Sequence, residues 1–126
     1  GVEVARQLGL EEERVFKTLV TQAASGKYYV FVIPVAEELN LKKAASAVHE
    51  KKIEMIKSRE LLPLTGYIHG GSSPVGMKKF FRTVFDLSAK NREKIFFSGG
   101  RIGLQIETSP GEIEKVIRIE YADIAK

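Results

Sequence analysis

The run Tyr28-Tyr29-Val30-Phe31-Val32-Ile33-Pro34-Val35 is apolar at both odd and even positions, so a strand over these residues buries side chains on both faces. A strand of this kind lies in the interior of a sheet. Arg14–Thr21, upstream of it, also has the pattern of a strand, and Ser25-Gly26-Lys27 has the composition of a hairpin turn. The sequence therefore predicts a hairpin that supplies the central strand of the fold.

The elements expected outside this hairpin mix helices with strands. They are the tail of an amphipathic helix over Val2–Leu8, a helix from Leu41 to about Glu50 capped by Asn40, a short strand over Ile53–Ile56, a helical turn over Ser58–Leu64, a strand over Phe80–Asp86, a strand pair over Glu93–Glu107 turned at Ser98–Arg101, a helix that begins at Ser109-Pro110-Gly111-Glu112, and a last strand over Arg118–Ala122. This order predicts an α+β domain with a mixed, barrel-like sheet flanked by helices.

Two sets of apolar residues in the second half of the chain are expected to face the core. They are Ile102, Leu104 and Ile106 in the second strand of the pair, and Ile113, Val116 and Ile117 in the last helix.

The composition is that of one folded domain over residues 1–126. The chain is 44% hydrophobic and 29% charged, and no apolar run approaches the roughly 18 residues of a membrane span. The absence of cysteine excludes disulfides and thiolate catalysis, and two histidines alone make a zinc site unexpected. We expect a cytoplasmic protein with no metal, cofactor or membrane contact. Because the chain starts at Gly1 inside a helical pattern, we also expect that an N-terminal segment precedes it.

The net charge of +4 and the pI of 9.3 are typical of proteins with a polyanionic partner. The basic residues Lys78, Lys79 and Arg82 directly follow the most glycine-rich part of the chain. On charge alone, a nucleic-acid face and an ordinary solvated surface both remain open.

That glycine-rich part, Gly66–Gly76, holds four of the chain's 11 glycines. Glycine and proline weaken helices and strands, so the segment is predicted to be a shaped loop whose backbone N–H groups can point at a ligand. It does not match a Walker loop, because Met77 and Lys78 occupy the positions of the lysine and the hydroxyl residue. The glycines at 99, 100 and 103 do not form a dinucleotide-binding fingerprint either.

No catalytic group stands out from spacing alone. Ser72 or Ser73 with His69 could form a nucleophile and base, but no orienting carboxylate is evident, and turn-forming serines explain them better. Lys17, on the same strand face as Val15 and Leu19, either blocks a sheet edge or projects into a pocket mouth. From that strand alone, the structural interpretation of Lys17 is favoured.

Several segments together resemble the YbaK/ProX family of aminoacyl-tRNA deacylases, in the family's order and over essentially the whole chain. They are Val15–Val20, Pro34-Val35 with Leu41–Ala45, Lys51–Met55, Thr65–Tyr67, Gly70–Gly76, Ser98–Leu104 and Ala122–Ala125. The resemblance implies a mixed-sheet domain that hydrolyses mischarged tRNA in trans, with Cys-tRNA(Pro) first and Ala-tRNA(Pro) next among the substrates. The same fold occurs as an editing domain in bacterial prolyl-tRNA synthetases.

The resemblance also implies roles for particular residues. Lys17 matches the family's active-site lysine, and Gly70, Gly71, Ser72 and Ser73 belong to its loop, which continues to Pro74. The further residues expected to bind substrate are Gly76, Tyr67, His69, Gly103 and Gln105, and those expected to bind tRNA are Lys78, Lys79 and Arg82. Gln105 stands where some members have Asp, which bears on amino-acid preference.

The expected mechanism needs no protein nucleophile, because an aminoacyl ester is already activated. Positioning the carbonyl and stabilising its oxyanion with loop N–H groups suffices, and substrate or water supplies the attacking group. The expected partners are the acceptor end of tRNA and a prolyl-tRNA synthetase, and the expected state is a monomer or weak homodimer. The alternative is a non-catalytic module of the same fold that binds tRNA, a nucleotide or a protein.

Overall fold

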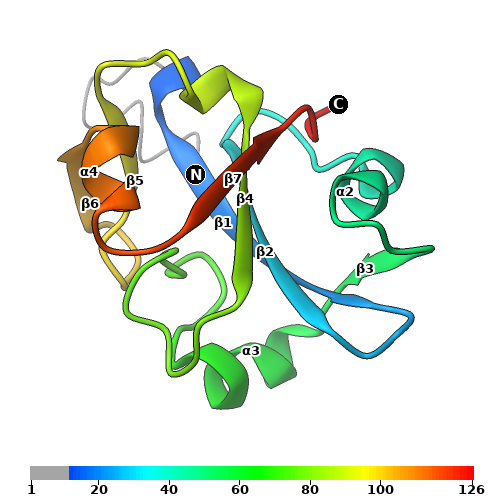
Figure 1. Ribbon diagram of the computed structural model, residues 1–126. Helices are drawn as coiled ribbons and strands as arrows, with labels where there is room; N and C mark the ends of the chain where they lie inside the picture. The colour runs from blue at the N-terminus through cyan, green and yellow to red at the C-terminus, as the bar shows by residue number, and fades with distance from the viewer. Residues whose placement is uncertain (1–11) are drawn as a thin grey trace.

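The computed structural model describes residues 12–126, so the helix expected over Val2–Leu8 lies outside the described residues (Figure 1). Its elements are η1 (Glu12–Arg14), β1 (Phe16–Ala23), β2 (Tyr28–Pro34), α2 (Leu41–Ala47), β3 (Ile53–Met55), α3 (Ser58–Thr65), β4 (Arg82–Asp86), η2 (Leu87–Ala89), β5 (Ile95–Ser98), β6 (Gln105–Thr108), α4 (Pro110–Glu114) and β7 (Ile119–Ala122). None of the helices within this range is long and apolar enough to cross a membrane.

The sheet is mixed, as predicted. Its order is β3-β1-β2-β4-β7, with β1 antiparallel to β2 and β3, and with β4 parallel to β2 and β7. β2 lies at the centre, and its Phe31, Val32 and Ile33 have no exposed surface. The expectation of a central strand flanked by a hairpin partner is confirmed, and so is the α+β class.

Two apolar layers cover the two faces of this sheet, and Figure 1 shows α2 on one side of it and α4 with the β5–β6 hairpin on the other. On one face, Phe31 and Ile33 pack with Ala44 and Val48 beside α2. On the other face, the side chains of β1, β2 and β4 pack with Leu61 of α3, with β5, and with Ile113 of α4. Because neighbouring residues of β2 serve opposite layers, both layers depend on this strand.

The predicted helix caps are confirmed. The Asn40 carboxamide accepts hydrogen bonds from the backbone N–H groups of Lys42 and Lys43, each at 3.1 Å. The Ser109 hydroxyl accepts one from the N–H of Glu112 at 3.1 Å. The first of these helices ends at Ala47 instead of Glu50. His49, just beyond its end, adopts a positive φ of 58°, which a helix cannot continue through.

The prediction that Ile102, Leu104 and Ile106 face the core is wrong. They are 64%, 41% and 38% exposed. β6 starts only at Gln105, so Ile102 and Leu104 lie in the turn, and the β5–β6 hairpin is buried through Ile95 and Phe97 of β5. Of the stripe predicted for the last helix, Ile113 is buried and Ile117 is partly buried against the same core, but Val116 is 71% exposed because α4 ends at Glu114.

Asp86, at the end of β4, ties the C-terminal segment to the sheet. Its carboxylate accepts hydrogen bonds from the backbone N–H groups of Ile124 at 3.1 Å and Ala125 at 3.2 Å. It also accepts bonds from the N–H and hydroxyl of Ser88, at 3.1 Å and 2.6 Å. Burial raises the pKa of Asp86, but these hydrogen bonds outweigh it and hold the pKa below its usual value.

We predict that Asp86→Asn lowers the free energy of unfolding by about 1–3 kcal/mol at neutral pH, because buried N–H groups lose a charged acceptor. A carboxylate whose pKa is lowered in the folded state stabilises the fold at pH values above its ordinary pKa of about 3.9. This stabilisation is lost as the pH falls toward the lowered pKa. Urea unfolding from pH 7 to pH 2 should therefore show a flatter acid limb for the variant. Asp123→Asn is the control, since Asp123 has only an exposed ion pair with Lys43. Equal profiles for the two variants would contradict the prediction.

Candidate functional site

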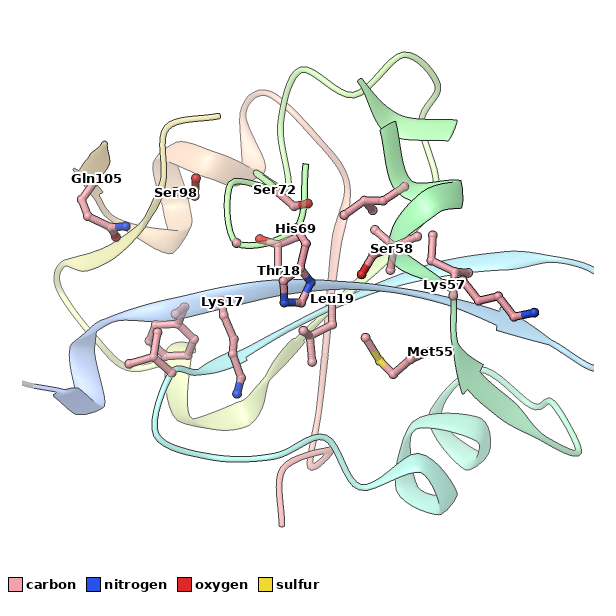
Figure 2. Close-up of a pocket in the computed structure, with 16 residues that line it drawn as sticks. Lys17, Thr18, Leu19, Met55, Lys57, Ser58, His69, Ser72, Ser98 and Gln105 are labelled. Carbon is pink, nitrogen blue, oxygen red and sulfur yellow. The ribbon is translucent and has the colours of Figure 1, made fainter. Parts of the chain in front are cut away.

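A cavity of about 340 Å³ lies against β1 and is closed by three other parts of the chain (Figure 2). These parts are the end of β3 with the start of α3, the glycine-rich loop, and the β5–β6 hairpin. The cavity is lined by Phe16, Lys17, Thr18, Leu19, Val20, Val35, Met55, Ile56, Lys57, Ser58, Leu61, His69, Gly70, Ser72, Ser98 and Gln105. Five residues singled out in the sequence, Lys17, His69, Gly70, Ser72 and Gln105, therefore come together.

The cavity follows an open edge of β1. On this edge Val15, just before β1, forms an isolated bridge with Phe96. The next backbone hydrogen bond along the edge runs from the Ile56 N–H to the Val20 carbonyl at 3.3 Å. The strand register with β2 directs the N–H and C=O of odd-numbered β1 residues toward β2, so those of Thr18 point to the other edge. No strand among residues 12–126 pairs with that edge between Val15 and Val20, which leaves the Thr18 backbone facing the cavity.

Two polar side-chain atoms in the wall lack a hydrogen-bond partner. They are the Thr18 hydroxyl oxygen and the Gln105 amide oxygen, and both are buried. Burying such groups unpaired costs free energy, so they indicate a place for a ligand donor or a water molecule. Gln105 is among the residues predicted from the sequence, whereas Thr18 is not. The available signal was its position, since Thr18 is a polar residue on the Phe16/Val20 face of a strand.

Lys17 lies on the opposite face of β1 from Thr18, and Figure 2 shows its ammonium group directed away from Ser72. It therefore borders the cavity from the outer side of the strand. Burial lowers the pKa of Lys17, and the nearby charge of Glu38 partly opposes this. The ammonium group has no ion-pair partner within 4.0 Å in residues 12–126.

The glycine-rich loop lines the cavity with only some of its residues. His69, Gly70 and Ser72 border it, whereas Gly71 and Ser73 do not. The Gly71 N–H donates to the Ile68 carbonyl at 3.0 Å, so this N–H serves the loop itself. The N–H groups of Gly70 and Ser72 donate no hydrogen bond within the described chain. These two are the loop donors that a ligand in the cavity could use.

The remaining loop residues hold the loop in shape. The Tyr67 hydroxyl donates to the Val75 carbonyl at 2.6 Å, and its ring lies against Gly76 and Gly100, both at positive φ. Pro74 is buried and borders a different hollow. Gly103, also at positive φ, lies in the turn before β6 and outside the cavity. The structure therefore places Tyr67, Pro74, Gly76 and Gly103 away from the cavity lining.

The three basic residues expected to meet tRNA also lie outside the cavity. Arg82 forms a two-pronged ion pair with Glu120 at 2.6 Å and 2.7 Å. The Lys78 ammonium donates to the Pro63 carbonyl at 3.4 Å, and Lys79 is exposed. These three side chains therefore differ in how available they are to a partner.

No arrangement for a serine nucleophile is present in the described part of the chain. The Ser72 hydroxyl donates to the Ile68 carbonyl at 3.4 Å, and the Ser73 hydroxyl accepts from the Val75 N–H. No hydrogen bond joins either serine to His69, and residues 12–126 hold no group of three or more histidines and carboxylates that could bind a metal. The groups that remain available in the cavity suit positioning and backbone hydrogen bonding of a ligand.

We predict that Glu38→Gln lowers the pKa of Lys17 further, because the variant removes the charge that opposes the effect of burial. The pKa can be followed by NMR of ¹³C-methylated lysines. Glu37→Gln, one residue away, should leave it unchanged. A rise, or no change, on replacing Glu38 would show that this charge does not act on Lys17.

We predict that Gly71→Ala lowers the free energy of unfolding by about 1–3 kcal/mol. A Cβ atom at Gly71 would lie 3.1 Å from the Arg101 Cα and 3.2 Å from the Ile102 nitrogen, both rigid backbone atoms. Gly111→Ala is the matched control, since its nearest contact would be 3.9 Å away. Urea unfolding should show the control unchanged or stabilised by about 0.4–1 kcal/mol. Equal stability of both variants would contradict the close packing of the loop on the hairpin turn.

Comparison with known proteins identifies the relatives of this chain. Residues 2–116 match the family model described as the aminoacyl-tRNA editing domain. The chain is 45% identical over 121 residues to an Enterococcus faecalis protein named "Putative Cys-tRNA(Pro)/Cys-tRNA(Cys) deacylase EbsC", covering 96% of this chain and 74% of that protein. It is 31% identical over 88 residues to the proline–tRNA ligase of Pelobacter propionicus, covering 70% of this chain but 15% of the ligase.

A solved structure described as "a putative trans-editing enzyme for prolyl tRNA synthetase" has the same fold. It superposes with a TM-score of 0.87 and 25% identity, covering 98% of this chain and 78% of the other. The resemblance drawn from the motifs is thus confirmed at the level of the family. The chain belongs to the aminoacyl-tRNA editing domains.

Proposed function

We propose that this chain hydrolyses mischarged aminoacyl-tRNA in trans, with Cys-tRNA(Pro) as its first substrate and Ala-tRNA(Pro) as its second. One observation carries the proposal: a cavity in an editing domain collects unused backbone donors, two unpaired buried acceptors and a lysine around one strand edge. Such a site suits an ester that needs only positioning and charge stabilisation.

The aminoacyl group occupies the cavity on the Thr18 side of β1. Its carbonyl oxygen faces the N–H groups of Gly70 and Ser72, which stabilise the developing oxyanion. Its α-amino group donates hydrogen bonds to the buried oxygens of Thr18 and Gln105. Gln105 carries no charge, so this contact relies on hydrogen bonding and not on an ion pair.

The Lys17 ammonium lies on the other side of the strand edge and binds the 3′-terminal adenosine of the tRNA. The ammonium is half-buried and points away from Ser72, which suits a ribose oxygen or a phosphate on the outer side of the strand. The lowered pKa is compatible with this role, because burial disfavours a charge that a phosphate would then stabilise.

The attacking group comes from the substrate or from water. In a cysteinyl ester the side-chain thiol can attack its own carbonyl: a C–S bond forms, the ester C–O bond breaks, and the departing ribose oxygen takes up the thiol proton. Water then opens the resulting thiolactone to give free cysteine. For alanine, which has no thiol, a water molecule has to attack the carbonyl: its oxygen forms the new C–O bond, the ester C–O bond breaks, and its proton passes to the departing ribose oxygen. The apolar part of the wall on the Thr18 side, which includes Phe16, Val20 and Leu61, suits a small side chain of either kind.

The name of the Enterococcus relative supports cysteine, and the match to a proline–tRNA ligase supports tRNA(Pro) and a synthetase as the source of the error. The match concerns only 15% of that ligase, so action in trans is supported instead by the relative named as a deacylase and by the solved structure described as a putative trans-editing enzyme.

Deacylation of a panel of mischarged tRNAs tests this proposal. Wild-type protein should release cysteine from Cys-tRNA(Pro) faster than alanine from Ala-tRNA(Pro), and spare Pro-tRNA(Pro). Lys17→Ala should lower kcat/KM by about 100-fold. Thr18→Val should lower it by less than about 100-fold, because the Thr18 backbone remains in place. Lys27→Ala, an exposed lysine at the far end of the β1–β2 hairpin, is the control. If wild-type protein binds tRNA but hydrolyses none of these esters, the chain is a non-catalytic binding module.

A further inference from the structure

An exposed aromatic ring stands between the glycine-rich loop and β4. Phe80 is 61% exposed, whereas its neighbour Phe81 is partly buried and packs edge-on against Tyr28 with ring centroids 5.9 Å apart. A ring of this size normally gains free energy by burial, so an isolated chain derives no benefit from presenting it to water.

Two shallow hollows meet at this ring. One, of about 100 Å³, is bordered by Phe80, Lys79 and Pro74 among others. The second, of about 390 Å³, is bordered by Phe80, Arg82, Arg118 and Glu120 among others. Each hollow therefore offers the ring face together with at least one basic side chain.

The charge around Phe80 is positive. Arg82 and Glu120 neutralise each other through their two-pronged ion pair. Lys79 and Arg118 are exposed, and neither forms an ion pair within residues 12–126. An apolar ring flanked by two such cations is complementary to a nucleobase with its adjoining phosphates.

We propose that Phe80, Lys79 and Arg118 form an RNA-contact surface in which the ring stacks on an unpaired base and the two cations bind the flanking phosphates. A paired base is already stacked on its neighbours, so the ring selects a single-stranded segment or an end of a helix. The identification of this RNA as the tRNA substrate rests on the proposed function.

The surface and the cavity share one loop. His69, Gly70 and Ser72 reach the cavity, and the same segment continues to Lys79 and Phe80. The eight Cα–Cα steps from Ser72 to Phe80 span at most about 28 Å even when the chain is fully extended. One RNA molecule can therefore touch the ring while its 3′ end enters the cavity.

RNA binding by Phe80 variants tests this surface. The dissociation constants of uncharged tRNA and of a short unstructured RNA are measured by fluorescence anisotropy at several salt concentrations. Phe80→Ala should weaken binding about 10-fold, whereas Phe80→Tyr, which keeps a stackable ring, should stay within about threefold of wild type. Leu87→Ala is the control, since Leu87 is 47% exposed and follows β4 at its other end.

The salt dependence of RNA binding tests the roles of Lys79 and Arg118 separately from that of Phe80. Lys79→Gln and Arg118→Gln should each reduce the slope of log Kd against log salt by about 0.7–0.9, because each removes one phosphate contact. Both side chains are exposed, so these variants test the surface even if Phe80→Ala fails to fold. Wild-type affinity in all three variants, or a salt-independent Kd, would overturn the proposal and favour a protein partner for this ring.

Because the assay uses uncharged RNA, it does not depend on hydrolysis. If Phe80→Ala weakens RNA binding but the wild-type protein hydrolyses no ester, the RNA-contact surface is supported and the proposed function is rejected. If Phe80→Ala binds RNA normally and the wild-type protein does hydrolyse esters, the RNA-contact surface is rejected and the proposed function stands.

Discussion

The incomplete pairing of β1 is the constraint on which the site depends. Along β2 the strand is paired from Phe16 to Gln22, but on its other edge β3 pairs only from Thr21 to Ala23. The stretch between the Val15–Phe96 bridge and Val20 therefore has no strand beside it. An unpaired edge is normally a liability, because its N–H and C=O groups seek a partner. Here the glycine-rich loop and the β5–β6 hairpin cover the gap without filling it, and the space that remains is the cavity. The rigidity of the site thus comes from β2, which is buried on both faces and fixes the position of β1.

Where the sequence carried a local physical signal, the prediction agreed with the structure. The apolar run at the centre predicted β2, and Asn40 and Ser109 predicted two helix starts, because capping depends on residues three or four positions apart. The alternation of Ile102, Leu104 and Ile106 was equally regular but misleading. Alternation shows that a strand has two unlike faces, but not which layer covers them. That depends on how the hairpin packs on β1, which is a long-range contact that spacing does not encode.

Some residues of the candidate site could likewise be predicted from the sequence, and others could not. Lys17, Gly70 and Ser72 are predicted as site residues from the sequence, and all three border the cavity. The roles within the loop could not be read from composition, because Gly71 and Ser73 have the same chemistry as their neighbours but use their groups inside the loop. Thr18 was missed since its importance arises from strand register: its backbone points to the one part of the β1 edge that lacks a partner strand.

The distribution of polar groups around the cavity bears on what chemistry it can support. A hydrolase that attacks with its own side chain needs a nucleophile, a base and an orienting group within hydrogen-bond distance of one another. In the described residues the two loop serines are engaged with backbone atoms of the loop, and the buried carboxylate Asp86 is engaged with Ile124 and Ala125. The cavity lining offers instead backbone N–H donors at Gly70 and Ser72 and unpaired acceptor oxygens at Thr18 and Gln105. Such a site can lower a barrier only for a substrate that is already activated and that supplies its own attacking group or a water molecule, and an aminoacyl ester meets the first of these conditions.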